Sequence, residues 1–297
     1  MCNATVVGSA AAPAAPAPAA GPPAAPASPA LAPKTAPRPL LGEHEVVQSA
    51  EGKGVKVEVL AYRHLAGTRV LCSDDRLYYE ETLGRRAKRI KWTLSDTSIL
   101  MEPGLLHFMK GHLTLKTKAG DVGGVLGLAK GLSRRMLAKE TIHRNLFEGT
   151  GEIHTEPTMG HYIILRVDNE TYTVDKGMYC CSEATLSVKA VMQKNVSSGL
   201  FGGEGLFQTE ISGDGLCVLT CPVPVEELVC YELNDDRLSV DGTFAVMRTG
   251  DVTFSVKKAA QGFYSSATSG EGMLQTFEGT GKVWIAPTLD IYQRRMA

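Results

Sequence analysis

Two stretches of twelve residues, far apart in the chain, have nearly the same sequence, and this repetition limits the fold more than any other feature. Residues 147–158 read FEGTGEIHTEPT and residues 277–288 read FEGTGKVWIAPT, with seven of the twelve positions identical. A weaker third copy, ISGDGLCVLTCP, begins at Ile211. Repetition at a fixed period is typical of a fold built from copies of one unit. The cores of the three copies lie 64 and 66 residues apart, at Gly149 and Gly151, Gly213 and Gly215, and Gly279 and Gly281.

A second element alternates with the first along the chain. It reads EPGLLHFMKGHLTLK at 102–116, DKGMYCCSEATLSVK at 175–189 and VDGTFAVMRTGDVTFSV at 240–256. Each copy has an anchoring glycine near its start, at Gly104, Gly177 and Gly242. The alternation predicts three modules, over residues 44–118, 119–192 and 193–297, the last of which includes a closing C-terminal hairpin.

The local pattern of these modules is that of β-strands. Short runs such as residues 55–59 and 253–256 alternate apolar and polar side chains, which is typical of half-buried strands. Because glycine adopts positive φ without a Cβ clash, each strand–Gly-x-Gly–strand stretch is interpreted as a hairpin, and all nine glycines named above are expected at turns. One hairpin cannot bury its own apolar face. We therefore expect an all-β protein whose modules share a core in a pseudo-threefold arrangement.

Two segments depart from the strand pattern. The first 40 residues contain fifteen Ala and ten Pro, and no acidic residue precedes Glu43. Frequent proline prevents helix formation, so residues 1–43 are interpreted as a disordered arm, with a targeting signal as the alternative. Residues 126–139 are expected to form one short amphipathic helix, packed on a sheet edge or contacting a membrane or partner.

Taken together, the motifs resemble a known family. The ordered set is GRRAKRIKWTL (84–94), MEPGLLHFMKGHLTL (101–115), FEGTGEIHTEP (147–157), VDKGMY (174–179), GLFGGEGLFQTEISGDG (199–215), VDGTFAVMRTGDVTFSV (240–256) and TSGEGMLQTFEGTGKVWIAPT (268–288). It resembles the altered-inheritance-of-mitochondria family, number twenty-four, over about residues 45–292, and is most similar to the prokaryotic-type members.

The resemblance implies three duplicated domains similar to the tryptophan RNA-binding attenuator protein, each a short double-stranded β-helix or jelly-roll-like sandwich. Eukaryotic members are linked to the organisation of the mitochondrial inner membrane, whereas prokaryotic-type members have no established reaction. The resemblance therefore implies a fold and carries over no catalytic residues.

Several kinds of site are incomplete in the sequence. His154 and Glu156 share one face of a predicted strand, but no His-x-His pair accompanies them, so neither a metal nor another cofactor is predicted. The seven cysteines lack Cys-x-x-Cys spacing and are expected to be reduced thiols, with Cys217 and Cys221 on one strand face and Cys180 and Cys181 on opposite faces. The glycine-rich stretches at 120–131 and 202–205 do not match a phosphate-binding loop.

One basic run, residues 85–92, stands out in a chain whose formal net charge is −1. A cluster of cations beside a tryptophan is able to bind phosphate and stack on a base, although a solvated strand or a salt-bridged seam between modules explains the same pattern. If the run were one strand, alternation would place Arg85 and Arg89 on one face and Arg86 and Lys88 on the other. The candidate contact residues for nucleic acid or another anion are Arg85, Arg86, Lys88, Arg89, Lys91 and Trp92.

These observations predict a non-enzymatic scaffold or interaction protein, and association with a membrane complex is compatible with them. Two alternatives stay open: a nucleic-acid-binding module that uses residues 85–91, and a binder of a small amino-acid-like ligand at the module seams. Protein partners are expected, and a homo-oligomer is compatible with the sequence. No apolar run reaches the ~18 residues of a membrane span. The expected location is the cytoplasm, with mitochondria as the alternative.

Overall fold

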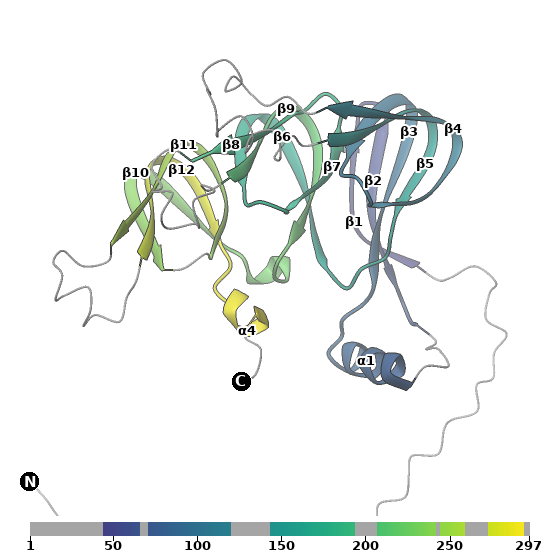
Figure 1. The fold of residues 1–297 in the computed structure, drawn as a ribbon, viewed down its shortest axis with the longest axis horizontal. Coiled ribbons are helices and arrows are strands. Elements are labelled where there is room, and N and C mark those ends of the chain that lie inside the picture. The colour runs from purple at the N-terminus through teal and green to yellow at the C-terminus, as the bar shows by residue number, and fades with distance from the viewer. Residues whose placement is uncertain are drawn as a thin grey trace, which may run out of the picture. The chain divides into compact units, whose positions relative to one another are not determined.

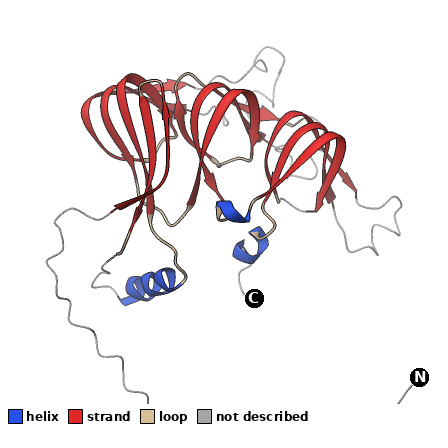
Figure 2. Cartoon of the chain, turned by 180° about the vertical axis from the view of Figure 1, so that it is seen from behind, coloured by secondary structure: helices blue, strands red, loops and turns tan. Residues whose placement is uncertain are grey.

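The protein is described from a computed structural model, and the description covers residues 44–65, 71–119, 143–193, 207–241, 244–258 and 273–293. Most of these residues lie in β-strands, so the prediction of a β-rich fold is confirmed in its coarse form (Figures 1 and 2). The strands are β1 (His44–Gly52), β2 (Val55–Tyr62), β3 (Lys88–Met101), β4 (Leu106–Ala119), β5 (His143–Thr155), β6 (His161–Val174), β7 (Tyr179–Glu183), β8 (Ser187–Met192), β9 (Phe207–Cys221), β10 (Val229–Asp241), β11 (Ala245–Lys258) and β12 (Met273–Ile285).

Three short helices accompany these strands within the described ranges: α1 (Leu71–Thr82), the 3-10 turn η3 (Val225–Glu227) and α4 (Leu289–Gln293). None of the three was predicted from the sequence. The helix predicted over residues 126–139 lies outside the described residues, as do the arm at 1–43 and the predicted turn at Gly242.

All strand pairs are antiparallel and belong to one twelve-stranded sheet. The main path runs β1-β2-β3-β7-β9-β6-β11-β12-β10, with β5 also on β3, β4 on β5 and β8 on β9. Each Gly-x-Gly strand therefore lies between two others: β5 between β3 and β4, and β12 between β10 and β11, while β9 pairs with β6 and with the shorter β7 and β8.

The Gly-x-Gly motifs do not form hairpins, and this part of the prediction is wrong. A neighbouring backbone passes so close to β5 that a Cβ built on Gly151 would lie 2.2 Å from the carbonyl oxygen of Lys110. The glycines thus permit close approach of two strands. Six glycines expected at turns lie inside continuous strands instead: Gly149 and Gly151 in β5, Gly213 and Gly215 in β9, and Gly279 and Gly281 in β12.

The middle copy needs the same correction, although its crowding comes from side chains. Gly215 was predicted at a turn, but it lies within β9 and pairs with Val167 of β6. A Cβ on Gly215 would lie 2.9 Å from the hydroxyl oxygen of Thr185 and 3.3 Å from the Cβ of Glu183. Gly215 is therefore required by the segment between β7 and β8 that passes close to it.

Two of the predicted turn glycines are confirmed. Gly104 and Gly177 lie in turns, before β4 and β7 respectively, with φ of 86° and 85°. A Cβ at either position would meet nothing within 4 Å. These two glycines are thus required by backbone conformation alone.

The threonine between the glycines holds a bulge in the strand opposite. The register of β3 against β5 shifts between Leu94 and Thr97, and Asp96 in this bulge has φ of 51°. The hydroxyl oxygen of Thr150 accepts a hydrogen bond from the Asp96 N–H at 3.0 Å. The copy at 277–288 repeats this bond, since the Asp235 N–H donates to Thr280 Oγ1 at 3.1 Å. In both copies the threonine between the two glycines therefore fixes the register of the neighbouring strand.

The buried apolar side chains of the described residues form three clusters, whereas the sequence analysis expected one shared core. The first includes Trp92 and Phe147, lies among β2, β3 and β5, and extends to residues of β6, β7 and β9 such as Cys181. The second lies among β6, β7 and β9 and includes Tyr179 and Leu219. The third lies among β10, β11 and β12 around Phe277. Phe244 packs against both the second and the third cluster.

A buried polar network links the second and third clusters where β6 meets β11. The Arg248 guanidinium donates to Gln208 Oε1 at 2.7 Å, and Gln208 Nε2 donates to Asp175 Oδ1 at 2.8 Å. Burial raises the pKa of Asp175 to about 6, although Gln208 and Arg248 act in the opposite direction. Burial likewise lowers the pKa of Arg248 to about 10. The charged form of Asp175 is thus disfavoured in the folded chain.

We predict that Gly151→Ala destabilises the fold by more than about 3 kcal/mol, because the new methyl group collides with a backbone oxygen. The matched control is Gly104→Ala: its φ is also positive, but a Cβ there meets nothing within 4 Å. We expect it to cost about 1 kcal/mol from backbone conformation alone. Urea unfolding of the full chain measures both values, and equal losses for the two variants would show that close strand approach is not what requires glycine.

We predict that the contribution of Asp175 to the stability of the chain falls as pH rises from about 4 to 6. The pKa of Asp175 is higher in the folded chain than its ordinary value of 3.8. Protonation of Asp175 therefore stabilises the folded chain fully below pH 3.8, and this stabilisation is lost above about pH 6. Asp175→Asn should remove this decline, whereas Asp251→Asn, at an exposed position on β11, should keep it. Thermal unfolding across this pH range is the measurement, and parallel curves for Asp175→Asn and the wild type would contradict the prediction.

Candidate functional site

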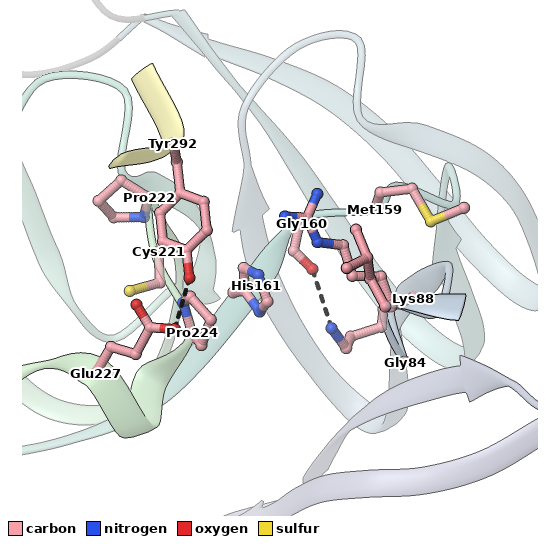
Figure 3. A pocket seen from close by; sticks show the side chains of 12 residues that line it. Gly84, Lys88, Met159, Gly160, His161, Cys221, Pro222, Pro224, Glu227 and Tyr292 are labelled. Atoms are coloured by element: carbon pink, nitrogen blue, oxygen red, sulfur yellow. Dashed lines mark hydrogen bonds between the residues drawn. The ribbon is translucent and has the colours of Figure 1, made fainter. Parts of the chain in front are cut away.

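A cavity of about 610 Å³ lies where β3, β6, β9 and α4 come together (Figure 3). Its walls come from three separate parts of the sequence: residues 83–88, residues 159–161 and residues 221–227, with α4 added from the end of the described chain. The lining residues are Leu83, Gly84, Arg85, Lys88, Met159, Gly160, His161, Cys221, Pro222, Pro224, Glu227 and Tyr292.

One wall of the cavity is basic. Lys88 opens β3, and its backbone forms two hydrogen bonds with Thr158 at 2.7 and 2.8 Å. The Lys88 Nζ donates to the carbonyl oxygen of Gly160 at 3.4 Å. Burial, followed by the charge of Arg86, lowers the pKa of this partly buried ammonium group. Arg85 lies 3.4 Å from Glu80, and its guanidinium stands over the Tyr292 ring at 5.8 Å.

A second wall carries an anion. Glu227 in η3 accepts a hydrogen bond from the Tyr292 hydroxyl at 2.6 Å and another from the Thr288 hydroxyl. These two bonds lower the pKa of the Glu227 carboxyl, so it is ionised at neutral pH. Pro224 has no N–H and fixes the entry into η3. The carboxylate is therefore held in place by α4.

His161 and Cys221 lie on paired strands between the two walls. They face each other in the register of β6 and β9, and Figure 3 shows His161 between Lys88 and Glu227. Burial, with smaller effects from Lys88 and Arg85, lowers the pKa of His161, so its imidazole is neutral at neutral pH. Burial raises the pKa of the Cys221 thiol, and the thiol form is a poor nucleophile. The site thus offers hydrogen bonds and fixed charges.

The structure brings two of the six predicted contact residues, Arg85 and Lys88, to this cavity and distributes the rest elsewhere. Arg86 forms an ion pair with Glu45 at 2.5 Å. The Arg89 guanidinium stands over the rings of Tyr62 and Phe108, at 5.6 and 5.4 Å. On the same outer sheet surface, Lys91 lies 2.8 Å from Glu152 and 3.9 Å from Glu58.

Trp92 is wholly buried, so the expectation that it stacks on a base is wrong for this structure. Its side chain alternates inward with Ile90 and Leu94 into the first cluster. The indole N–H donates to Cys181 Sγ at 3.1 Å. The face pattern considered for residues 85–89 also does not apply, because β3 begins only at Lys88.

The candidate metal pair is not assembled either. His154 stacks on the Phe108 ring, with centroids 4.3 Å apart, and its Nε2 lies 3.7 Å from Glu152. Glu156 follows the end of β5 at an exposed position. Within the described ranges, no three His, Cys, Asp or Glu side chains are grouped so as to hold a metal ion.

The cysteine predictions are partly confirmed. Cys217 and Cys221 both pack into the second cluster, as their spacing on β9 predicts. Cys180 and Cys181 instead belong to the same cluster, next to a register shift in β7, although strand alternation predicts opposite faces. All four thiols are buried and unpaired.

The sequence analysis missed His161, Glu227 and Tyr292 as site residues. His161 stands in no metal-binding or catalytic pattern in the sequence, and Glu227 and Tyr292 belong to no repeat. The available signal was the pair of prolines at 222 and 224, at the end of the motif copy that begins at Ile211, which marks a place where β9 must end.

Comparison with known proteins identifies the family. Residues 81–288 match the family model described as "Mitochondrial biogenesis AIM24". The chain is 25% identical over 193 residues to an uncharacterised protein of Streptococcus pyogenes serotype M6, covering 63% of this chain and 76% of that protein. A crystal structure of a Streptococcus pyogenes protein is similar with a TM-score of 0.49 and 21% identity, over 70% of this chain and 91% of that one. The family model spans most of the chain, which confirms the resemblance seen in the ordered motifs: the chain belongs to the AIM24 family.

Proposed function

We propose that this chain is a non-enzymatic binding protein whose cavity holds a small amino-acid-like molecule. The observation that carries the proposal is the placement of opposite charges on different walls of one cavity: Lys88 on one side and Glu227 on the other (Figure 3). An amino acid carries a carboxylate and an ammonium group that match these charges. The volume of about 610 Å³ lies within the usual range for small-molecule sites.

The individual contacts favour this class of ligand. The Lys88 Nζ has one long hydrogen bond, to a neutral carbonyl, so a ligand carboxylate would supply an anionic partner to a partly buried cation. The Glu227 carboxylate keeps lone pairs for a ligand ammonium after accepting its two hydroxyl bonds. Leu83, Met159 and Tyr292 add apolar surface for a side chain.

We predict that one or more of the standard amino acids raises the thermal stability of the full chain. At about 100-fold over Kd, binding adds about 2.7 kcal/mol to the free energy of unfolding. Analogues lacking either the carboxylate or the amino group should raise it less, because each removes one charge match. If no amino acid changes the unfolding temperature, the proposed ligand class is wrong.

The matched variants are Lys88→Gln in the cavity and Lys116→Gln on β4. Lys116 pairs with Glu148 at 2.5 Å on an exposed surface and does not line the cavity. Lys88→Gln should weaken binding about tenfold or more, and Lys116→Gln should leave it unchanged. Calorimetric titration measures both. Unchanged affinity in Lys88→Gln would place any bound amino acid at another site.

A second candidate function, a scaffold that docks another protein, is favoured by exposed apolar residues near the cavity. Tyr79 on α1, Leu83 just after it and Ile291 on α4 are 65%, 66% and 74% exposed. Contiguous exposed apolar groups are typical of interaction surfaces. No helix within the described ranges is long and apolar enough to cross a membrane.

This second candidate predicts that Tyr79→Ser combined with Ile291→Ser reduces the capture of partners by the full chain. Val46→Ser is the control, since Val46 is 50% exposed on β1 and lies on another element. In-cell crosslinking followed by mass spectrometry compares the proteins recovered. Recovery of the same proteins with both variants would exclude α1 and α4 as the docking surface.

Nucleic-acid binding through residues 85–91 stays a prediction that receives less support. Arg86 and Lys91 have acidic partners and Arg89 has aromatic ones, so each would have to exchange a contact in order to bind phosphate. The cytoplasmic location, and mitochondria as its alternative, also stay predictions that imaging of a tagged full-length chain would test.

We further propose that β3–β5, β6–β9 and β10–β12 are three copies of one attenuator-protein-like module. Their corresponding Gly-x-Gly strands, each paired with strands of its own set, support this interpretation. The pseudo-threefold arrangement of the modules stays a prediction.

A further inference from the structure

Two short strand pairings join the three sets of strands β3–β5, β6–β9 and β10–β12. The pairings occur at corresponding places in the sets. The last residues of β3 pair with β7, and the last residues of β6 pair with β11. We call these pairings the two internal seams. The first consists of Met101↔Cys181, Leu100↔Ser182 and Ile99↔Glu183, and the second of Val174↔Met247, Thr173↔Arg248 and Tyr172↔Thr249.

The register of the Gly-x-Gly strands β5, β9 and β12 shows which residue of the third set corresponds to Met101 and Val174. Met101 pairs with Asn145, which lies four residues before Gly149. Val174 pairs with Thr209, four residues before Gly213. In the third set, the residue four before Gly279 is Gln275, and it pairs with Val240 in β10. Val240 therefore occupies the seam position on β10.

The same reasoning identifies the seam position on β4. Cys181 pairs with Val218 and Met247 pairs with Trp284, each five residues after the first glycine of its motif. His154 is the corresponding residue of β5, and it pairs with Phe108. The seam residues of β4 are thus Phe108, Met109 and Lys110, and those of β10 are Val240, Ser239 and Leu238.

Both of these strands have an open edge. Among the described strands, β4 pairs only with β5, and β10 pairs only with β12. In the internal seams Cys181 and Met247 are 0% and 6% exposed, whereas Phe108 at the corresponding place is 42% exposed. Met109 is 41% exposed, although its counterparts Ser182 and Arg248 are 0% and 8% exposed. The apolar groups of β4 are therefore uncovered where the fold elsewhere covers them.

The open seam is also more apolar than the internal ones. In the second seam Arg248 bonds to Gln208, and in the first the Arg144 guanidinium, near Glu102, donates to the carbonyl oxygen of Val188. At the positions of Arg248 and Gln208, the open seam has Met109 on β4 and Leu274 on β12. Joining β4 to β10 would thus bury methionine, phenylalanine and leucine, and the one charged side chain at the seam positions is Lys110, where the internal seams have the buried Glu183 and Thr249.

We propose that β10 of one chain pairs with β4 of a second copy of the same chain. The pairing is antiparallel, with Val240 opposite Phe108, Ser239 opposite Met109 and Leu238 opposite Lys110, the register of both internal seams. The occupant is a second copy because the two open edges are complementary to each other in that register. Such a head-to-tail contact uses two different surfaces, so it builds a ring or an open chain of copies. It satisfies the exposed backbone groups of both edges.

The test is a disulfide between two differently tagged full chains, one carrying Met109→Cys and the other Ser239→Cys. Cys2, Cys72 and Cys230 are replaced by Ser in both. Directly opposed residues place their Cβ atoms about 4.5–5.5 Å apart, close to what a disulfide requires. We expect a product with both tags under mild oxidation. Thr114→Cys in place of Met109→Cys is the control, because it lies five residues further along β4 and should give no such product.

A second measurement uses the mass of the chain in solution by light scattering. Met109→Asp should weaken self-association about tenfold or more, whereas Leu115→Asp, 47% exposed on the same strand, should not. A single-chain mass at every concentration, together with no doubly tagged product, would overturn the proposal. So would an intrachain disulfide in a monomer carrying both cysteines, because β10 would then pair with β4 of its own chain. Circular dichroism checks that each variant is folded.

Discussion

The structure depends on the close approach of two strands at the Gly-x-Gly motif. In β5 and β12 the carbonyl oxygens of a neighbouring strand occupy the space that a Cβ would need, at 2.1–2.2 Å for Gly149, Gly151, Gly279 and Gly281. The threonine between the glycines then reaches the bulge of the strand on the other side. One short motif thus sets the spacing on one edge of its strand and the register on the other, and the apolar clusters are aligned as a consequence.

The cavity follows from how the strands end. Lys88 and His161 are the first residues of β3 and β6, and Cys221 is the last residue of β9, so the cavity forms where three strands begin or stop. Backbone there is no longer committed to the sheet, and loop residues with charged side chains line the space. The charged groups are positioned by rigid strands on one side and by the short η3 and α4 segments on the other.

Much of the fold was readable from the sequence, but less of the site was. Period-two alternation and the repeated motif identified the strands, because both signals are local. The role of glycines such as Gly151 and Gly215 was misjudged, since a glycine at a turn and a glycine under a crossing segment look alike until the neighbour is placed. Trp92 shows the same difficulty: its flanking cations suggested an exposed surface, while strand alternation directs it inward. The cavity joins residues more than 200 positions apart, such as Arg85 and Tyr292, and no local pattern reports that.

The glycines of the middle copy of the motif have different surroundings from those of the two outer copies. A Cβ on Gly213 would meet its nearest neighbour at 3.4 Å, an ordinary contact, and an aspartate replaces the threonine that holds the bulge in the outer copies. Its second glycine, Gly215, is crowded by the side chains of Thr185 and Glu183, at 2.9 and 3.3 Å from a Cβ built there. A side chain added to the outer copies would therefore collide with the backbone of the neighbouring strand, whereas one added at Gly215 would meet side-chain atoms, which are able to move.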